Sequence, residues 1–111
     1  NSADIGGGIS LLNSNLKISD NSIIDNSATS GGGIYCNASN PVITHNSIIN
    51  NYAGNAGGGI SSGYNSYSLI SDNTISYNNA GSAAGGIYCF YEVLKICEIH
   101  LFNPKESKSF C

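Results

Sequence analysis

Gly32-Gly33-Ile34 decides the fold of this 111-residue chain, because the same tripeptide occurs four times. The other copies are Gly7-Gly8-Ile9, Gly58-Gly59-Ile60 and Gly85-Gly86-Ile87, so the isoleucines lie 25, 26 and 27 residues apart. A self-similar period between about 20 and 50 residues is typical of solenoids, in which each repeat buries its apolar face only against its neighbours. The sequence therefore predicts a stack of similar units.

A second pattern, Ile-x-x-Asn-x-Ile-x-x-Asn-x-Ala, follows three of the four tripeptides and aligns in columns. The columns are Ile18, Ile43 and Ile70; Asn21, Asn46 and Asn73; Ile23, Ile48 and Ile75; Asn26, Asn51 and Asn78; and Ala28, Ala53 and Ala80. Insertions lengthen the later repeats at residues 54–56 and 82–84 and around Gly63 and Tyr64. We expect loops at these places.

The apolar residues alternate at every second position, as in Ile9-x-Leu11 and Ile34-x-Cys36, and no part of the repeats holds them at helical spacing over a helix length. This excludes a helical solenoid. About 25 residues at roughly 3.3 Å each give a contour of about 80 Å, enough for a coil of three short strands and three bends. Successive coils would stack at about 4.8 Å, with every strand pairing in parallel with its counterpart one repeat away.

The asparagine and glycine columns favour this coil. Asparagine tolerates a left-handed backbone at a bend, and identical asparagines one coil apart can hydrogen-bond as a ladder. The paired glycines would allow positive φ and a close approach of backbones where the coil enters its strand. A disordered linker is the alternative, because low-complexity tracts share this composition with 10% charged residues. Linkers, however, do not keep isoleucine in register.

A family resemblance rests on two runs of the second repeat, Gly31-Gly32-Gly33-Ile34-Tyr35-Cys36 and Asn40-Pro41-Val42-Ile43-Thr44-His45-Asn46-Ser47-Ile48. They resemble the repeat of right-handed parallel β-helix proteins of the pectate-lyase-like superfamily, over residues 5 to about 91. The first run is similar to long secreted or surface-attached microbial proteins, and the column pattern also to polymorphic outer-membrane autotransporter repeats. The resemblance implies an all-β solenoid of about three to four coils and an extracellular or cell-surface location. It does not imply an activity, because the same coil carries lyases, hydrolases, adhesins and stalks.

Two regions differ in character. Residues 1–91 are predicted to be coils taken from a longer solenoid, with flanking coils of the same parent chain as neighbours, because the chain begins partway through a repeat. No signal peptide and no apolar run long enough to span a membrane is present. Residues 92–111 lose the repeat pattern. They are read as a capping strand or helix, with Ile96 and Leu101 at the offsets of a degenerate last coil, or as sequence unrelated to the family.

The cysteines predict no metal site. Cys36 and Cys89 share one inward column but lie two coils apart, about 9.6 Å, too far for a disulfide. We expect both to be small buried hydrophobes. Cys97 and Cys111 could pair in an oxidising compartment, but no Cys/His spacing argues for zinc, so neither metal nor cofactor is expected.

Catalysis is not expected in this segment. The chain has no arginine, and Lys17 is the one lysine of the repeats, whereas the resemblance implies that lyases would need a basic residue beside calcium-holding acids. Glycoside hydrolases need two carboxylates at about 5 to 9.5 Å. Asp20, His45 and Asp72 form one column at an outward bend. This polar column could bind a cation or shuttle a proton, or it could simply be a solvated corner.

Tyr35 and Tyr88 offer the best candidate binding face, with Ser61 (and Ser10) in the alternate coils. If Ile34 and Ile87 point inward, the tyrosines point outward about 9.6 Å apart, near the span of two sugar residues, with flat faces for stacking. They could equally be ordinary strand residues on a half-exposed face. Ile24 and Ile49 also face outward and are expected to be covered by a neighbouring segment or partner.

The net charge of the chain limits the classes of partner that it is expected to bind. A net charge of −3 without a basic stripe argues against nucleic acid and acidic membranes. The sequence thus predicts an extracellular or cell-surface scaffold, a stalk or an adhesive, carbohydrate-binding surface, whose partner is a polysaccharide or a host or cell-surface glycan. The alternative is a non-catalytic fragment of a polysaccharide lyase or glycoside hydrolase.

Overall fold

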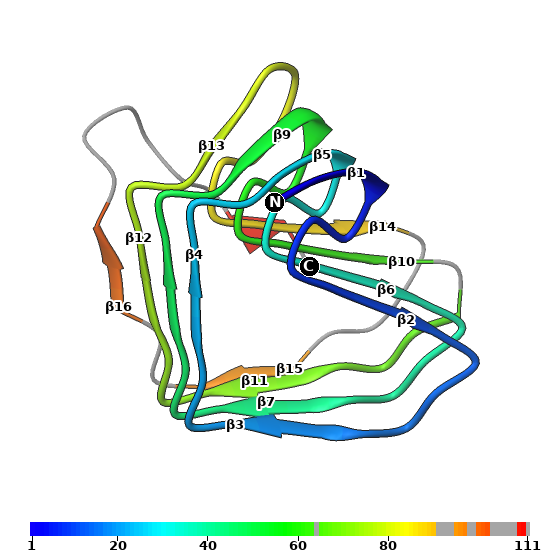
Figure 1. Ribbon diagram of the computed structural model, residues 1–111. Coiled ribbons are helices and arrows are strands. Elements are labelled where there is room, and N and C mark those ends of the chain that lie inside the picture. Colours follow the sequence, from blue (N-terminus) through cyan, green and yellow to red (C-terminus); the bar gives the residue numbers. More distant parts are fainter. Residues whose placement is uncertain (64, 91–94, 98–99, 103–108, 111) are drawn as a thin grey trace.

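The chain winds into a solenoid of strands in four sheets (Figure 1). The computed structural model describes all residues except 64, 91–94, 98–99, 103–108 and 111. Sheet A contains β1 (Ser2–Ile5), β5 (Ser27–Ser30), β9 (Tyr52–Ala56) and β13 (Asn79–Ala80). Sheet B contains β2 (Ile9–Leu12), β6 (Ile34–Asn37), β10 (Ile60–Gly63), β14 (Ile87–Phe90) and β17 (Ser109–Phe110).

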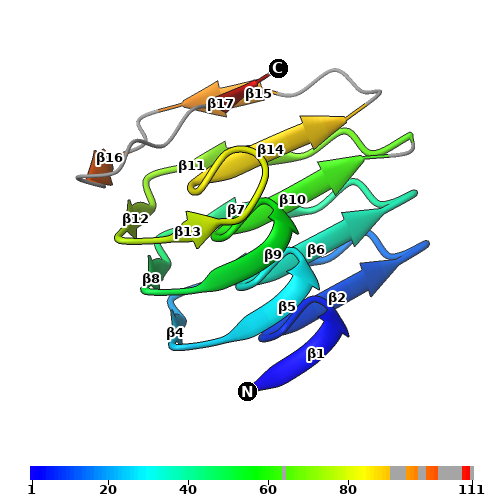
Figure 2. The same ribbon diagram turned by 90° about the horizontal axis from the view of Figure 1, so that it is seen from above.

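The other two sheets complete the wall of the solenoid. Sheet C contains β3 (Lys17–Ser19), β7 (Val42–Thr44), β11 (Leu69–Ser71) and β15 (Lys95–Cys97). Sheet D contains β4 (Ser22–Ile24), β8 (Ser47–Ile49), β12 (Thr74–Ser76) and β16 (His100–Phe102). Every pairing between described strands is parallel and joins strands of successive coils, as the stack in Figure 2 shows. The prediction of an all-β parallel β-helix is confirmed.

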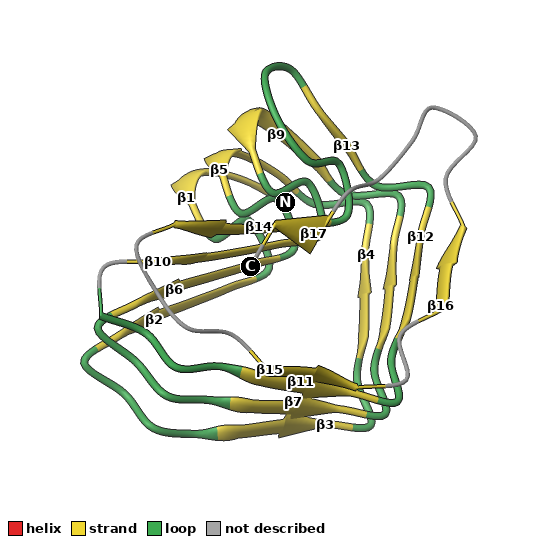
Figure 3. Ribbon diagram, turned by 180° about the vertical axis from the view of Figure 1, so that it is seen from behind, coloured by secondary structure: helices red, strands yellow, loops and turns green. Residues whose placement is uncertain are grey.

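The prediction of three strands per coil is wrong, because each coil has four. The two asparagine columns lie five residues apart, and each marks a separate corner. The chain therefore bends between sheets C and D and again between D and A, which leaves only three residues for β4, β8 and β12. Figure 3 shows these short strands as a side of their own.

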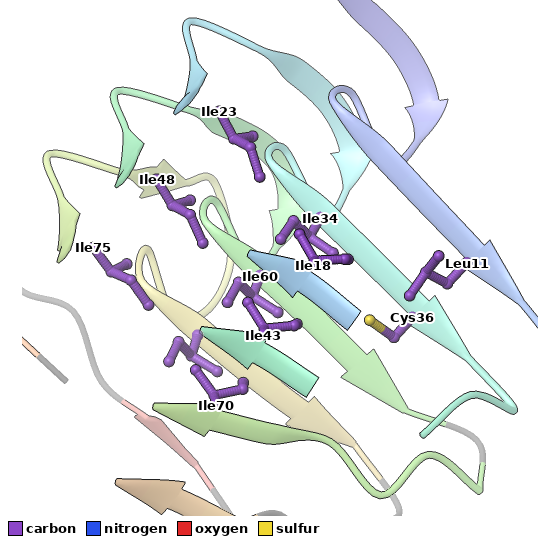
Figure 4. Packing of buried hydrophobic residues seen from close by; sticks show 11 residues of the cluster. Leu11, Ile18, Ile23, Ile34, Cys36, Ile43, Ile48, Ile60, Ile70 and Ile75 are labelled. Carbon is purple, nitrogen blue, oxygen red and sulfur yellow. The ribbon is translucent and has the colours of Figure 1, made fainter. Parts of the chain in front are cut away.

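Isoleucine columns fill the interior. The register places Ile9, Ile34, Ile60 and Ile87 opposite one another in sheet B, while sheets C and D stack the Ile18 and Ile23 columns in the same way. Figure 4 shows side chains from the three columns, among them Ile18, Ile34 and Ile48, gathered between the sheets. Ile34, Ile43, Ile48, Ile60, Ile70 and Ile87 are completely buried. Burying one such side chain contributes about 1.5–3 kcal/mol, so the columns supply the main driving force for stacking.

The bends are made by the residues that precede the ladder asparagines. Positive φ angles occur at Asp20, His45 and Asp72 before the first column, and at Asp25, Asn50 and Tyr77 before the second. The expectation that the ladder asparagines themselves are left-handed is therefore wrong. They use their backbone N–H and their side chain together to reach the next coil, so the turn falls on the residue before them.

The glycine pairs serve close approach rather than positive φ. A Cβ on Gly33 would lie 2.6 Å from the carbonyl oxygen of Gly59 in the next coil, far inside van der Waals contact. The left-handed angle belongs to the residue before each pair, which is Gly31 in the second repeat and Ala84 (φ 50°) in the fourth. The expectation that these glycines allow a close approach of backbones is thus correct, and the expectation that they adopt positive φ angles is wrong.

The insertion at residues 54–56 is not a loop, contrary to expectation. It lies inside β9, where Ala53 pairs with Ala28 but Ala56 pairs with Ser30, so one extra residue forms a β-bulge. The next coil follows this bulge, because Ala83 bridges Ala56 and the N–H groups of Ser82 and Ala83 both donate to the Asn55 carbonyl. The parallel sheet absorbs the insertion and arches away from the other three sheets (Figure 1).

The described parts of residues 92–111 are strands. Ile96 in β15 lies opposite Ile70, and Leu101 in β16 lies opposite Ile75, the positions that the repeat assigns to them. Residue 111 and most of the remaining segment lie outside the described residues, and so does the pairing considered for Cys97 and Cys111.

Candidate functional site

A pocket of about 440 Å³ lies on the outside of the solenoid where sheets A and B meet. Its lining consists of tyrosine rings, hydroxyl and amide groups and small residues: Ser30, Tyr35, Asn55, Ala56, Ser61, Gly63, Ser82, Ala83 and Tyr88. We call it the tyrosine pocket. It brings together the three residues proposed for binding from the sequence, Tyr35, Ser61 and Tyr88.

The three residues are neighbours across sheet B. Ser61 in β10 pairs with Tyr35 of β6 on one side and with Tyr88 of β14 on the other. Both tyrosines are half-buried, and Ser61 is buried, with only 7% of its surface accessible to solvent. Ser10 continues the column into β2 but is exposed and does not line the pocket. The alternation of serine and tyrosine therefore leaves two aromatic rings with one small residue between them.

The opposite wall of the tyrosine pocket comes from the bulged end of sheet A. Asn55 lies in the bulge of β9, and Ser82 lies one coil further on. Sequence reasoning treated residues 54–56 and 82–84 only as insertions and assigned them no role. The signal was present, because the insertions end five and four residues before Ser61 and Tyr88 respectively, just ahead of the strands that carry these two residues.

The polar column lies elsewhere and lines no part of this pocket. Asp20, His45 and Asp72 are exposed at the corner between sheets C and D. The His45 Nδ1 atom lies 3.0 Å from the Thr44 hydroxyl, which in turn accepts a hydrogen bond from Ser71 at 3.4 Å. Among the residues that the structure describes, no group of three or more His, Cys, Asp or Glu side chains is placed to hold a metal ion.

Both asparagine columns are hydrogen-bonded from coil to coil. In the first, Asn46 Oδ1 accepts from the backbone N–H and the amide of Asn21, and Asn73 Oδ1 accepts likewise from Asn46, at 2.9–3.2 Å. The second column, Asn26, Asn51 and Asn78, repeats this arrangement at 2.9–3.0 Å. The amides of Asn46, Asn51, Asn73 and Asn78 also donate to a carbonyl of the preceding coil, as Asn51 does to Ile23 at 2.8 Å. These hydrogen bonds join successive coils of the scaffold, and none of the six asparagines lines the tyrosine pocket.

Two further columns at the corner between sheets B and C were missed. Ser39 Oγ accepts from the Ser14 N–H at 3.0 Å, and Ser66 Oγ accepts from the Ser39 N–H at 3.1 Å. The adjacent column runs in the opposite direction, because Asn15 Oδ1 accepts from the N–H of Asn40 in the following coil. The signal for both columns was their spacing, which repeats that of the isoleucines.

Comparison with known proteins identifies the fold family. A family model described as "Right handed beta helix region" matches residues 7–101. Searches among curated proteins and among solved structures gave no match. No helix in the described part of the chain is long and apolar enough to cross a membrane. The matched range covers most of the sequence and coincides with the coils of sheets A to D, and the chain therefore belongs to the right-handed β-helix family.

Proposed function

We propose that the chain is a non-catalytic scaffold segment of an extracellular or cell-surface protein that binds a polysaccharide or surface glycan in the tyrosine pocket. One observation carries the proposal: Tyr35, Ser61 and Tyr88 line a single concave site together with amide and hydroxyl groups. Aromatic faces provide the apolar contact for a sugar ring, and convergent polar groups provide its orientation.

The lining supports binding rather than turnover. The described residues of the pocket include no carboxylate and no basic side chain. Glycoside hydrolysis uses two carboxylates at about 5–9.5 Å, and general base chemistry needs a titratable group within hydrogen-bond reach of the substrate. The resemblance of residues 31–36 to secreted and surface-attached repeats supports the proposed extracellular location.

The test is a glycan array and a polysaccharide pull-down with the 111-residue chain, in which released products are also measured. The double variant Tyr35→Ala/Tyr88→Ala should lose binding by about tenfold or more, because it removes both stacking faces. Tyr67→Ala/Tyr77→Ala is the matched control, since both tyrosines are 59% exposed and lie outside the pocket.

Each outcome decides between functions. Binding that disappears only in the pocket variant, without product release, supports a lectin-like surface. Absence of binding to every glycan overturns the proposal and leaves a structural stalk. Product release from the bound polysaccharide would instead assign the chain to a lyase or hydrolase.

A further inference from the structure

We infer that the tyrosine pocket selects an uncharged glycan and that Asn55, in the bulge of β9, and Ser82, one coil further on, determine which one it holds. This inference rests on the proposed function and adds to it the ligand class and two specificity-determining residues.

Charged side chains lie away from the pocket. Lys17 is the only lysine or arginine in residues 1–90, and it starts β3 in sheet C rather than in sheet A or B. The acids of the same range occupy β1 and the corners beside sheet D: Asp4, Asp20, Asp25 and Asp72. None of these residues lines the pocket.

An anionic sugar therefore meets no cation among the described lining residues. A carboxylate or sulfate that leaves water for such a surface loses its hydration and gains no opposite charge in return. The net charge of −3 adds a weak repulsion that extends beyond the pocket. An uncharged sugar bears neither cost, and its hydroxyl groups match the hydroxyl and amide groups of the lining.

The bulge and the coil that follows it supply polar groups that make no hydrogen bond within the described part of the chain. The Asn55 carbonyl is occupied by the N–H groups of Ser82 and Ala83, at 2.9 and 3.1 Å. Its side-chain amide, by contrast, makes no hydrogen bond to any described residue and is exposed, as is the Ser82 hydroxyl. An amide offers two donors and one acceptor, the combination that recognises adjacent sugar hydroxyls.

The position of the bulge favours a role in specificity. The first coil lacks the insertion and passes directly from Ala28 to Ser30 through Thr29, whereas the next two coils carry an extra residue beside the pocket. β-bulges often occur next to binding sites, where they redirect a side chain. The pocket volume of about 440 Å³ lies in the lower part of the range of roughly 300–1,000 Å³ for small-molecule sites, which suits a short stretch of a glycan.

The experiment measures affinity for two sets of polysaccharides with the full chain. The neutral set contains glucan, mannan, xylan and galactan, and the anionic set contains polygalacturonate and a sulfated galactan. We expect binding to a member of the neutral set only, and we expect it to persist at about 1 M salt, where surface electrostatics is screened within about 3 Å. Far-ultraviolet circular dichroism and the melting temperature establish that each variant is folded.

Two variants test Asn55 and Ser82. Asn55→Ala and Ser82→Ala should each weaken neutral binding by about threefold to tenfold, the effect of one or two lost neutral hydrogen bonds. Asn79→Ala is the matched control, because Asn79 is exposed, lies in the adjacent strand β13 and does not line the pocket. Its affinity should equal that of the unmodified chain.

The failure of this inference is distinguishable from the failure of the proposed function. Binding of the anionic set that depends on Tyr35 and Tyr88 would leave the site in place and overturn the uncharged ligand. Neutral binding unchanged in both Asn55→Ala and Ser82→Ala would overturn the role of the bulge. Binding that survives the loss of both tyrosines, or no binding at all, would overturn the proposed function itself.

Discussion

The side-chain oxygen of Asn51 accepts two hydrogen bonds from Asn26, one from its backbone N–H and one from its amide, each at 3.0 Å. Asn51 also donates to the Ile23 carbonyl and to Asn78 Oδ1, at 2.8 and 2.9 Å, and it retains 1% of its exposed surface. One buried side chain thus joins three successive coils at the corner between sheets D and A.

Replacing this residue should destabilise the protein strongly. In Asn51→Ala the N–H and amide of Asn26 lose their acceptor and the Ile23 carbonyl loses a donor, all in a buried corner. Buried groups left unsatisfied cost about 1–3 kcal/mol each, so we expect the free energy of unfolding to fall by about 3 kcal/mol or more. Urea denaturation measures it. The exposed Asn79→Ala should change stability by less than about 0.5 kcal/mol, and equal effects of the two variants would contradict the ladder's role.

Position along a ladder should matter as much as residue type. Asn46 is 2% exposed and bonds to coils on both sides, whereas Asn21 is exposed and bonds to one side only. Asn46→Ala should therefore cost about 2 kcal/mol more than Asn21→Ala. The measurement is the difference between their urea midpoints on the same chain. If both substitutions lowered the free energy of unfolding equally, burial and bonding to two coils would add nothing to the stability that a ladder asparagine provides.

The isoleucine columns give a simpler contrast. Ile48 is completely buried in sheet D, and its truncation to alanine should cost about 2–5 kcal/mol through lost burial and the cavity that remains. Ile24 lies in the same sheet but faces outward and is 43% exposed, so Ile24→Ala should change the unfolding free energy by less than about 1 kcal/mol. A large cost for Ile24→Ala would show that another surface covers this face in solution.

Like-on-like stacking explains how much of the fold could be predicted from the sequence. Ile34 and Ile60 lie opposite each other because residues separated by one repeat along the chain become neighbours in successive coils. The same spacing brings Tyr35, Ser61 and Tyr88 into one column. The spacing alone does not predict at which residue the backbone turns. It could not predict that Asp20 rather than Asn21 takes the left-handed angle, which depends on how the ladder asparagine presents its N–H.

The far wall of the tyrosine pocket could not be predicted by aligning the repeats in columns, for a related reason. An insertion breaks the spacing, and whether the chain forms a loop or a bulge depends on which backbone groups the next coil can bond. Here the Asn55 carbonyl accepts hydrogen bonds from two N–H groups of the next coil, and β9 continues through the insertion. The same limit applies to Ser62, whose hydroxyl is buried at the position of Leu11 and Cys36 and lies 2.8 Å from that of Ser68. That partner belongs to another part of the repeat, just before β11.

Gly54 and Gly81 provide a matched pair for testing the bulge. They follow the paired residues Ala53 and Ala80, yet an added Cβ meets different surroundings at each. At Gly54 its nearest neighbours would be Thr29 Cα at 3.9 Å and the Ala28 carbonyl oxygen at 4.0 Å, which is ordinary contact. At Gly81 it would overlap the Gly54 carbonyl, a backbone atom that cannot move without shifting the bulge.

We therefore expect opposite results from the two alanine substitutions. Gly54→Ala should be neutral or stabilising by up to about 1 kcal/mol, because it restricts the unfolded chain without strain in the native one. Gly81→Ala should destabilise the protein by about 1–3 kcal/mol. It should also displace the adjacent Ser82, so that the proposed glycan binding weakens together with a fall in the melting temperature. Thermal melts and the binding assay on the same preparations measure both effects. If Gly81→Ala kept full stability and affinity, the close packing of the two bulged coils, and with it the rigid wall of the tyrosine pocket, would be refuted.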